Sequence, residues 1–377
     1  MKEKIVIIGA NDFQNPLILK AKEKGYETHV FAWKENAIGE KSADFFYPVS
    51  IVEKDKILEI CRSINPVGVC SIGSDLASVT VNYVASRLGL VANSDESILL
   101  STNKYAMRQA FYKAGDPIPQ FMEGDSMTKV VDVGINYPLI VKPTDRSGSR
   151  GVTKIKKEKE LKPAIANALV DSFEKKVMIE EFVTGKEYSV EFISYRDMHV
   201  FLALTEKTTT GAPHFIETGH FQPAEVTPAL KNKIINIVKK ALTTLKIKNG
   251  ASHSEVIVDA KEQVKIIEIG GRMGGDCIGS DLVPRSTGYD FVGMVIDIAC
   301  GKIPDFNLIY DPKPTEIRFI LNQKDLDCLE TMRQNEPERI VFESPIDTID
   351  ERIITDSSVR YGFYIFSQKS KKQKEDQ

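Results

Sequence analysis

Two glutamates, Glu255 and Glu268, lie in two short apolar runs that a polar link joins. The runs span Glu255–Val258 and Val264–Ile269, a pattern that predicts a β-hairpin. If the link 260–263 is a four-residue loop, the register places Glu255 opposite Glu268, about 5 Å apart at Cβ, where two carboxylates repel each other. A shared Mg²⁺ ion, which prefers carboxylate and phosphate oxygens, would remove the repulsion. An ordinary surface hairpin with two solvated acids is the alternative. The same register pairs Ile257 with Ile266 and Asp259 with Val264.

A glycine- and serine-rich segment, Asp145–Gly151, follows a strand-like run at Leu139–Val141 and the lysine Lys142. Gly148 and Gly151 allow backbone N–H groups to turn toward an anion, and the serines and the arginine of the segment add donors. No helix follows a GK[ST] sequence here, so the segment differs from a Walker loop. The pattern favours a phosphate-binding loop over a tight polar hairpin that binds nothing.

A second candidate binding segment is the strand-like run that ends at Glu180 and Glu181, before a break at Thr184 and Gly185. Backbone that leaves a strand offers C=O and N–H groups, which can pair with the edge of a purine. Glu187 could accept hydrogen bonds from ribose hydroxyls. Surface acids at a strand end would give the same pattern.

The polar, aromatic-containing segment Thr205–Pro223 is expected to be a long loop, and such loops are often functional. Within it, Glu217, His214 and His220 could recognise an amine or a proton. Arg285 could face an anionic group of a substrate. Exposed residues without a function are the alternative for each of them.

The N-terminal part of the chain alternates strand and helix patterns, which predicts a parallel, doubly wound sheet. Strands are expected at Lys4–Ala10, Glu27–Ala32 and Val67–Cys70, and helices at Asn15–Lys24, Lys54–Ile64 and Ser74–Leu90. Later helices are expected at Ser101–Ala114, Leu161–Lys175, Thr227–Leu245 and Asp290–Cys300. Gly9 lacks the further glycines of a GxGxxG fingerprint, so the pattern argues against a dinucleotide site.

These motifs occur in one order along the chain: Lys104, Lys142 with its glycine loop, the segment 180–187, and the Glu255 and Glu268 hairpin. Together they resemble the ATP-grasp superfamily of ligases, over roughly residues 2–311. Within it, the sequence IEIGGRMGGD looks most like the L-amino-acid ligase branch, which resembles the ATP domains of carbamoyl-phosphate synthase. The resemblance implies an ATP-grasp fold of two α+β subdomains behind an N-terminal α/β domain.

The resemblance also implies roles for single residues. A nucleotide-binding set is implied at Lys104, Lys142, Ser147, Gly148, Ser149, Gly151, Glu180, Glu181, Phe182, Val183 and Glu187. Lys104 and Lys142 would contact the phosphates, the backbone of Glu181 and Val183 would meet adenine, and Glu187 would meet ribose. Glu255 and Glu268 would bind Mg²⁺, as two ions that Mn²⁺ could replace. Arg272 and Lys142 would be catalytic, with Arg272 at the phosphoryl or carboxylate end.

One position departs from the family pattern. The family usually has an asparagine two residues after the second metal-binding glutamate, and here that residue is Gly270. In the expected register His253 lies opposite Gly270, on the face that carries both glutamates. His253 or a water could therefore replace the missing ligand, and a local hydrogen bond of His253 is the alternative.

The expected domain organisation follows from these assignments. An N-terminal α/β domain would span 1–100, and the ATP-grasp domain would span 101–310. The latter would divide into a small ATP-clamping subdomain at about 116–184 and a large metal and substrate subdomain at about 185–310. A small β-rich unit would span 311–367, before a disordered tail at 368–377.

Composition limits the class of protein. The 377 residues are 42% hydrophobic and 27% charged, as in soluble globular proteins, and the formal charge of −3 offers no bulk attraction to nucleic acid. No apolar run approaches the length of a membrane span. Five cysteines without CxxC spacing indicate reduced thiols and a cytoplasmic protein. A homodimer is the default expectation for the assembly.

The sequence therefore predicts an ATP- and Mg²⁺-dependent carboxylate–amine ligase that works through an acyl phosphate on small carboxylates and amines. Two alternatives stay open at this point. One is an enzyme that uses carboxyphosphate, and the other is a nucleotide-binding sensor or subunit without turnover.

Overall fold

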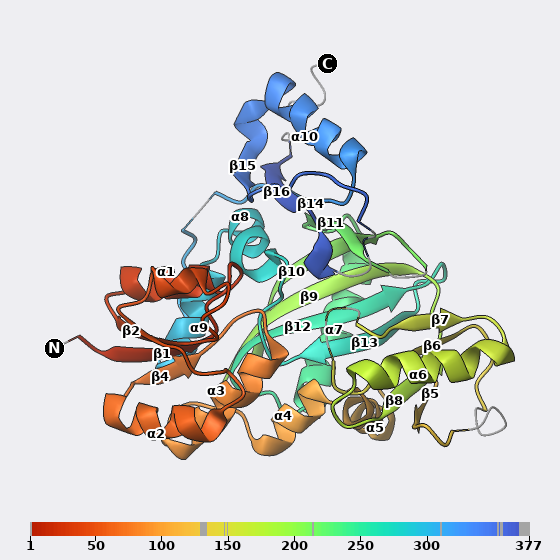
Figure 1. Ribbon diagram of the computed structural model, residues 1–377, viewed down its shortest axis with the longest axis horizontal. Coiled ribbons are helices and arrows are strands. Elements are labelled where there is room, and N and C mark those ends of the chain that lie inside the picture. Colours follow the sequence, from red (N-terminus) through yellow and green to blue (C-terminus); the bar gives the residue numbers. More distant parts are fainter. Residues whose placement is uncertain are drawn as a thin grey trace.

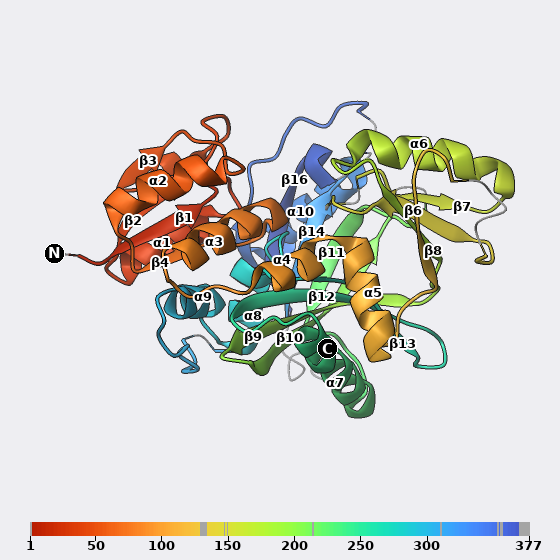
Figure 2. The same ribbon diagram turned by 90° about the horizontal axis from the view of Figure 1, so that it is seen from below.

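The strands form three β-sheets within the residues that the computed structural model describes: 2–128, 134–146, 148, 150–212, 215–309, 311–352, 354 and 357–368. The N-terminal domain and the small clamp flank one long central sheet, which the C-terminal strands extend (Figure 1). The view from below shows the N-terminal domain and the clamp at opposite ends of that sheet (Figure 2). No helix among these residues is long and apolar enough to cross a bilayer.

The N-terminal sheet is parallel, in the order β3-β2-β1-β4. Its strands are β1 (Lys4–Ile8), β2 (Glu27–Phe31), β3 (Phe45–Tyr47) and β4 (Gly68–Cys70), and its helices are α1 (Asn15–Glu23), α2 (Lys54–Ile64) and α3 (Asp75–Arg87). Ile5 and Ile7 of β1 pack with α1, whereas Val6 and Ile8 pack with α2 and α3. Both faces are covered, which confirms the predicted doubly wound sheet.

Two short helices lead from this domain to the clamp: α4 (Asp95–Thr102) and α5 (Lys104–Ala114). The single helix expected at Ser101–Ala114 is therefore wrong at its start. Asn103 adopts an extended conformation and its side chain accepts a hydrogen bond from Ala106 N at 3.0 Å, which caps a new helix. Lys104 becomes the first residue of α5.

The small clamp is a four-stranded antiparallel sheet in the order β5-β8-β6-β7, with α6 (Leu161–Asp171) packed against it. Its strands are β5 (Phe121–Gly124), β6 (Leu139–Pro143), β7 (Thr153–Ile155) and β8 (Val177–Glu181). The helix expected at Leu161–Lys175 is shorter than predicted, because Ser172 is extended and Lys175 has a φ of +56°.

The central sheet has the order β13-β12-β9-β10-β11-β14-β16-β15 and is antiparallel. Its strands are β9 (Lys186–Tyr195), β10 (Met198–Thr209), β11 (Glu217–Gln222), β12 (Gly250–Val258), β13 (Val264–Gly270), β14 (Thr315–Ile320), β15 (Ile340–Glu343) and β16 (Gly362–Ser367). Its helices are α7 (Pro228–Thr244), α8 (Val283–Thr287), α9 (Phe291–Ala299) and α10 (Gln323–Asn335). Short helices lie at Ile38–Glu40, Glu158–Glu160, Ile278–Leu282, Pro337–Arg339 and Ser357–Val359.

The two faces of β9 have different environments. Tyr188, Val190 and Phe192 pack in the core formed with α7. Glu187 and Glu191 alternate with them and so point to the other face, toward the clamp and the N-terminal domain. One face of β9 therefore packs in the hydrophobic core, and the other face carries polar side chains.

The segment expected to be one long loop, Thr205–Pro223, is mostly strand. It belongs to β10 through Thr209 and to β11 from Glu217, and the two strands pair with each other. The threonine-rich sequence suits a pleated surface, which explains the error.

The predicted β12–β13 hairpin is present, with a register that is partly wrong. Glu255 lies opposite Glu268 and His253 opposite Gly270, as expected. A β-bulge then shifts the pairing, so that Ile257 faces Lys265 and Val258 faces Val264. The extra residue on β13 is Ile267, and bulges of this kind re-aim neighbouring side chains.

The C-terminal strands continue the central sheet, because β14 pairs with β11 along Thr315 to Arg318. The domain boundaries given above, including the separate unit at 311–367, stay predictions. Of the expected tail at 368–377, Gln368 pairs with Pro314, and the other residues lie outside the described part of the chain.

Candidate functional site

A cavity of about 550 Å³ lies between the clamp and the central sheet. Most of the residues predicted for a site line it: Lys104, Lys142, Gly148, Glu180, Glu181, Phe182, Val183, Glu187, Glu217, His253, Glu255, Glu268 and Arg272. Gly151, His220 and Arg285 are not among the lining residues. The predicted residues Ser147, Ser149 and His214 lie outside the described residues.

Two cations converge on one buried carboxylate at the clamp end of the cavity. Lys142 contacts Glu180, and Arg108 Nη2 donates to Glu180 Oε2 at 3.0 Å. Burial opposes ionisation of Glu180, but the charges of Lys142 and Arg108 outweigh it and lower the pKa of Glu180. Glu180, predicted to touch the nucleotide, is thus turned toward these two cations. The cluster keeps one surplus positive charge beside the cavity.

Part of the lining of the cavity is aliphatic and forms an apolar slot. Ile140 and Val152 of the clamp and Ile257 and Ile267 of the hairpin line it. The β-bulge matters here, because it lets Ile267 and Glu268, neighbours in sequence, both reach the cavity. A slot with aliphatic walls suits a flat aromatic base.

The predicted adenine segment is partly engaged within the protein. Glu181 N donates to Gln120 O at 2.9 Å and Phe182 N donates to Pro138 O at 3.1 Å. The Glu181 carboxylate accepts from Lys265 Nζ at 2.8 Å. The Glu181 N–H is therefore already used in the clamp sheet.

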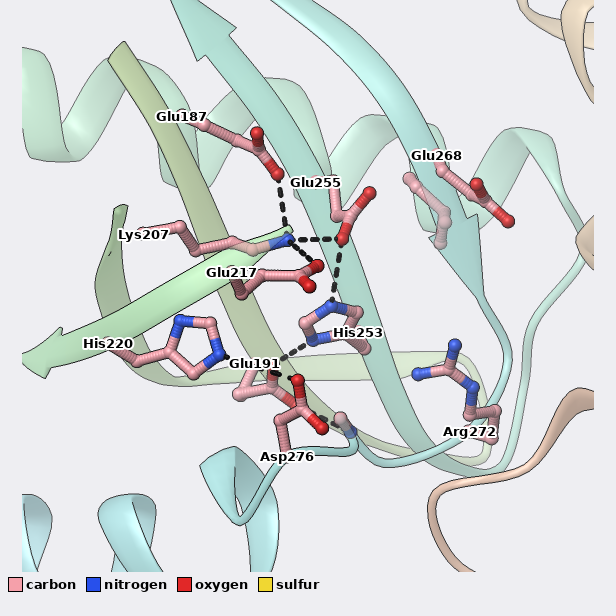
Figure 3. Close-up of polar contacts among 12 residues, drawn as sticks. Glu187, Glu191, Lys207, Glu217, His220, His253, Glu255, Glu268, Arg272 and Asp276 are labelled. Atoms are coloured by element: carbon pink, nitrogen blue, oxygen red, sulfur yellow. Dashed lines mark hydrogen bonds and ion pairs between the residues drawn. The ribbon is translucent and has the colours of Figure 1, made fainter. Parts of the chain in front are cut away.

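Lys207 is the central cation of the cavity, and sequence reasoning missed it. Its Nζ lies 2.7 Å from Glu187, 2.6 Å from Glu255 and 3.7 Å from Glu217 (Figure 3). Burial opposes the charge on Lys207, but these three carboxylates outweigh it and hold its pKa well above the usual value. The alternation of side chains along β10 could have identified Lys207 from the sequence.

His253 lies between two carboxylates rather than at an open position. Its Nδ1 contacts Glu191, and its Nε2 lies 3.6 Å from Glu255 Oε1 (Figure 3). Burial opposes protonation, but Glu191 outweighs it and raises the pKa of His253 to about 9. A protonated imidazole has no lone pair for a metal, so this geometry disfavours His253 as the replacement ligand.

The space beside Gly270 is filled by an ion pair from two domains. Arg272 Nε donates to Asp75 Oδ1 at 2.8 Å, and Nη2 donates to Oδ2 at 3.2 Å. A Cβ at Gly270 would lie 3.3 Å from both Arg272 and Asp75. An asparagine at Gly270 would therefore meet this pair. Asp75 starts α3, so the N-terminal domain reaches the cavity wall at Arg272.

Glu255 and Glu268 both face the cavity from neighbouring strands (Figure 3). Each is held by a cation of the chain, since Glu255 pairs with Lys207 and Glu268 contacts Lys104. Among the described residues, no group of three or more His, Cys, Asp or Glu side chains is arranged to hold a metal ion. These two carboxylates would need oxygens from a ligand or water to complete a site.

Comparison with known proteins identifies the fold around this cavity. Residues 135–281 match the ATP-grasp domain family model. Alanine–anticapsin ligase from Bacillus subtilis is 27% identical over 306 residues, which cover 70% of this chain and 63% of that protein. D-alanine–D-alanine ligase from Haemophilus influenzae (strain PittEE) is 29% identical over 184 residues, covering 47% of this chain and 60% of that protein. The chain thus spans less than two thirds of the length of these curated relatives.

Solved structures agree over the whole chain. L-amino acid ligase from Bacillus licheniformis has a TM-score of 0.81 at 21% identity, and the match covers 100% of this chain and 95% of that chain. Phosphoribosylglycinamide synthetase from Anaerococcus prevotii has a TM-score of 0.76 at 21% identity, and the match covers 100% of this chain and 96% of that chain. These likenesses show the fold. Residues 135–281 thus match the ATP-grasp domain family, and the whole chain has the fold of these solved structures.

Proposed function

We propose that the chain is an ATP- and Mg²⁺-dependent ligase that joins a small carboxylate to an amine through an acyl phosphate. One observation carries the proposal: the lysines Lys104 and Lys142 and the opposed carboxylates Glu255 and Glu268 line a single cavity. Several relatives and structural neighbours are ligases of amino acids by name, which supports the same class. The substrates are small molecules, and nucleic acid and membranes play no part.

The charges of the cavity support ATP as the co-substrate. Lys142 and Arg108 together carry two positive charges, and Glu180 carries one negative charge. A triphosphate would neutralise the positive charge that is left over. The aliphatic slot beside Ile140 and Ile267 would take the base. Glu187, which lines the same cavity, would accept from the ribose hydroxyls.

The residues present fit Mg²⁺, because its preferred ligands are carboxylate and phosphate oxygens. Glu255 and Glu268 would hold it. Lys207 and Lys104, which pair with these carboxylates here, would then contact phosphate oxygens of ATP. Bound there, Mg²⁺ supplies positive charge that neutralises the phosphoryl oxygens.

In the first step a substrate carboxylate oxygen attacks the γ-phosphorus of ATP and the bond to the bridging oxygen of ADP breaks. Arg272 would orient that carboxylate, and Lys142 and Lys104 add fixed positive charge where the transition state needs it. The amine nitrogen then attacks the acyl carbon, phosphate leaves, and the amine loses a proton to solvent. Water must be excluded meanwhile, because an acyl phosphate hydrolyses, and closure of the clamp on the sheet would do this.

The test is an ADP-release screen over amino acids and small dicarboxylates, with mass detection of the coupled product. We expect one carboxylate and amine pair to stimulate ADP release and to give an amide. Glu268→Gln should lower turnover by about 10²-fold or more, by loss of a group that stabilises transition-state charge. Glu262→Gln, an exposed change at the hairpin turn, is the matched control and should turn over like the wild type.

Two experimental results would contradict the proposal, and each would favour a different function. ADP release that depends on bicarbonate alone would favour an enzyme that uses carboxyphosphate. ATP binding without ADP release from any carboxylate would favour a nucleotide-binding sensor.

A further inference from the structure

A polar cluster at the edge of the cavity includes a residue from far along the chain. Arg360 Nη2 lies 2.9 Å from Glu217 Oε2, and Arg360 Nη1 lies 2.9 Å from Asp276 Oδ2. Its side chain is 6% exposed, and its guanidinium carbon lies 3.7 Å above the ring of Phe319. Arg360 lies outside the segment that matches the ATP-grasp model, residues 135–281.

Glu217 connects this arginine to the central cation of the cavity. One carboxylate oxygen of Glu217 lies 3.7 Å from Lys207, and Figure 3 shows the side chain directed at that ammonium. The other oxygen accepts from Arg360 and, at 3.1 Å, from Ser357 Oγ. Ser357 and Arg360 are three residues apart across a 3₁₀ turn, a spacing that places both on one side. Two donors from the C-terminal segment therefore fix the direction of Glu217.

Asp276 connects the same arginine to the segment that carries Arg272. Asp276 and Cys277 have φ of +49° and +59°, a conformation that is strained for residues other than glycine. Arg360 donates to Asp276 Oδ2, and His220 Nε2 lies 3.9 Å from the same oxygen (Figure 3). The ion pair thus helps to hold the backbone just after Arg272.

Attachment of the C-terminal strands does not require Arg360. Strand β14 pairs with β11 over four residues, and Ile317, Phe319 and Ile365 pack against Cys277, Ile278 and Leu282. Arg360 instead bridges two carboxylates: Glu217, which lines the cavity, and Asp276, which follows the segment that carries Arg272. Without it, Glu217 and Asp276 would be partly buried anions that lack their main counter-charge.

We propose that Arg360 is a positioning residue of the ligase site, which holds Glu217 against Lys207 and holds the segment after Arg272 through Asp276. The inference rests on the proposed function. It assigns to the C-terminal segment a part in binding the carboxylate and the amine, while the proposed phosphate contacts of Lys104 and Lys142 stay independent of it.

The experiment compares steady-state kinetics of wild type, Arg360→Gln and Arg360→Lys. In Arg360→Gln we expect the KM for the carboxylate or the amine to rise about tenfold or more while the KM for ATP changes less than about twofold. Arg360→Lys should be intermediate, because an ammonium keeps the charge but lacks the fork that reaches two carboxylates. If Arg360→Gln fails to fold, Asp276→Asn, which removes one carboxylate and keeps the shape, replaces it.

Arg339→Gln is the matched control. Arg339 belongs to the same C-terminal segment, contacts Glu336 and lies over the ring of Phe366, but Glu336, unlike Glu217, does not line the cavity. It should leave all KM values unchanged. Equal rises for ATP and the other substrates, or an Arg360→Gln variant that matches Arg339→Gln, would overturn the proposal.

Amide hydrogen exchange separates this proposal from the proposed function. In Arg360→Gln we expect faster exchange at residues 271–277 and unchanged exchange at residues 177–183. That result would support the positioning role even if the wild type released no ADP. Unchanged exchange at 271–277 would contradict it even if the ligase activity were established.

Discussion

The Nζ of Lys207 lies 2.6 Å from Oε1 of Glu255, one of the two glutamates that face each other across the β12–β13 hairpin. An ammonium of the chain therefore neutralises the carboxylate that is proposed to bind the metal. Any cation that binds at Glu255 must compete with Lys207 or displace it. This relationship leads to the first prediction.

Removal of the Lys207 charge should destabilise the protein and make its stability sensitive to Mg²⁺. Lys207→Met leaves three neighbouring carboxylates without their shared cation, and we expect a loss of about 2 kcal/mol or more, since breaking a buried ion pair is costly. Added Mg²⁺ should raise the melting temperature of this variant more than that of the wild type, because binding to the folded state stabilises it. Thermal melts with and without Mg²⁺ measure both effects.

Lys186→Met is the control for that prediction. Lys186 also pairs with a glutamate, Glu206, at 3.2 Å, but its side chain is 67% exposed. Exposed pairs contribute little, so its stability and its response to Mg²⁺ should match the wild type. A Lys207→Met variant that gains nothing extra from Mg²⁺ would contradict the proposed competition.

The buried pair of Arg108 and Glu180 should be needed for stability. Both side chains are almost completely buried, and Arg108 Nη2 also contacts the carbonyl of Ile267 at the β-bulge. Arg108→Met should lower the free energy of unfolding by about 3 to 5 kcal/mol, as expected when one partner of a buried pair is lost. Urea unfolding measures it, with Lys113→Met as the control, because Lys113 is an exposed residue of the same helix. Equal losses in the two variants would show that the pair contributes nothing.

Stability should fall in mild acid because of His199. The ring nitrogens of His199 contact Ser194 Oγ at 2.8 Å and Thr243 Oγ1 at 3.2 Å, and burial lowers its pKa. The unfolded chain therefore binds the proton more readily than the folded one. Stability from this residue is present above the unfolded value of about 6.5 and is lost as the pH falls through the lower folded value.

The measurement for His199 is urea unfolding of wild type and His199→Gln at about pH 8 and about pH 5.5, on either side of the unfolded histidine pKa. Wild type should lose more free energy of unfolding between the two than the variant does. Parallel losses in both proteins would assign the acid sensitivity to other groups.

Restoring the family asparagine at Gly270 should disturb the Arg272–Asp75 pair. A Cβ there already lies 3.3 Å from both residues, so a longer side chain must displace one of them. We expect Gly270→Asn to cost about 1 to 3 kcal/mol of stability, as overpacking usually does. The effects of Gly270→Asn and Asp75→Ala should be less than additive, because both act on the same ion pair. If the losses of unfolding free energy in the two variants add up in the double variant, the asparagine side chain does not act on the Arg272–Asp75 pair.

The hairpin shows how far sequence patterns reach. The alternation of apolar and polar residues placed Glu255 opposite Glu268 and His253 opposite Gly270 correctly. It did not foresee the bulge at Ile267, whose carbonyl is bound by Arg108 from α5. A bulge is one extra residue in the pairing, and the sequence of the two strands alone gives no sign of where a third element contacts them.

The segment 205–223 shows a second kind of failure. Its threonines and charged residues suggested a loop, and so Lys207 was never placed on a strand face. The pairing of β10 with β9 and β11 gives that segment its alternation and turns Lys207 toward Glu187 and Glu255.

By itself the sequence determined the doubly wound N-terminal sheet, the order of the nucleotide-binding motifs and the pair of hairpin glutamates, because each depends on residues near one another along the chain. Only the tertiary structure decided what surrounds those glutamates. Lys207, Asp75 and Arg360 come from separate elements and reach the cavity through contacts over long sequence separations. Local periodicity carries no information about such contacts, since the packing of sheet, clamp and C-terminal strands brings them together.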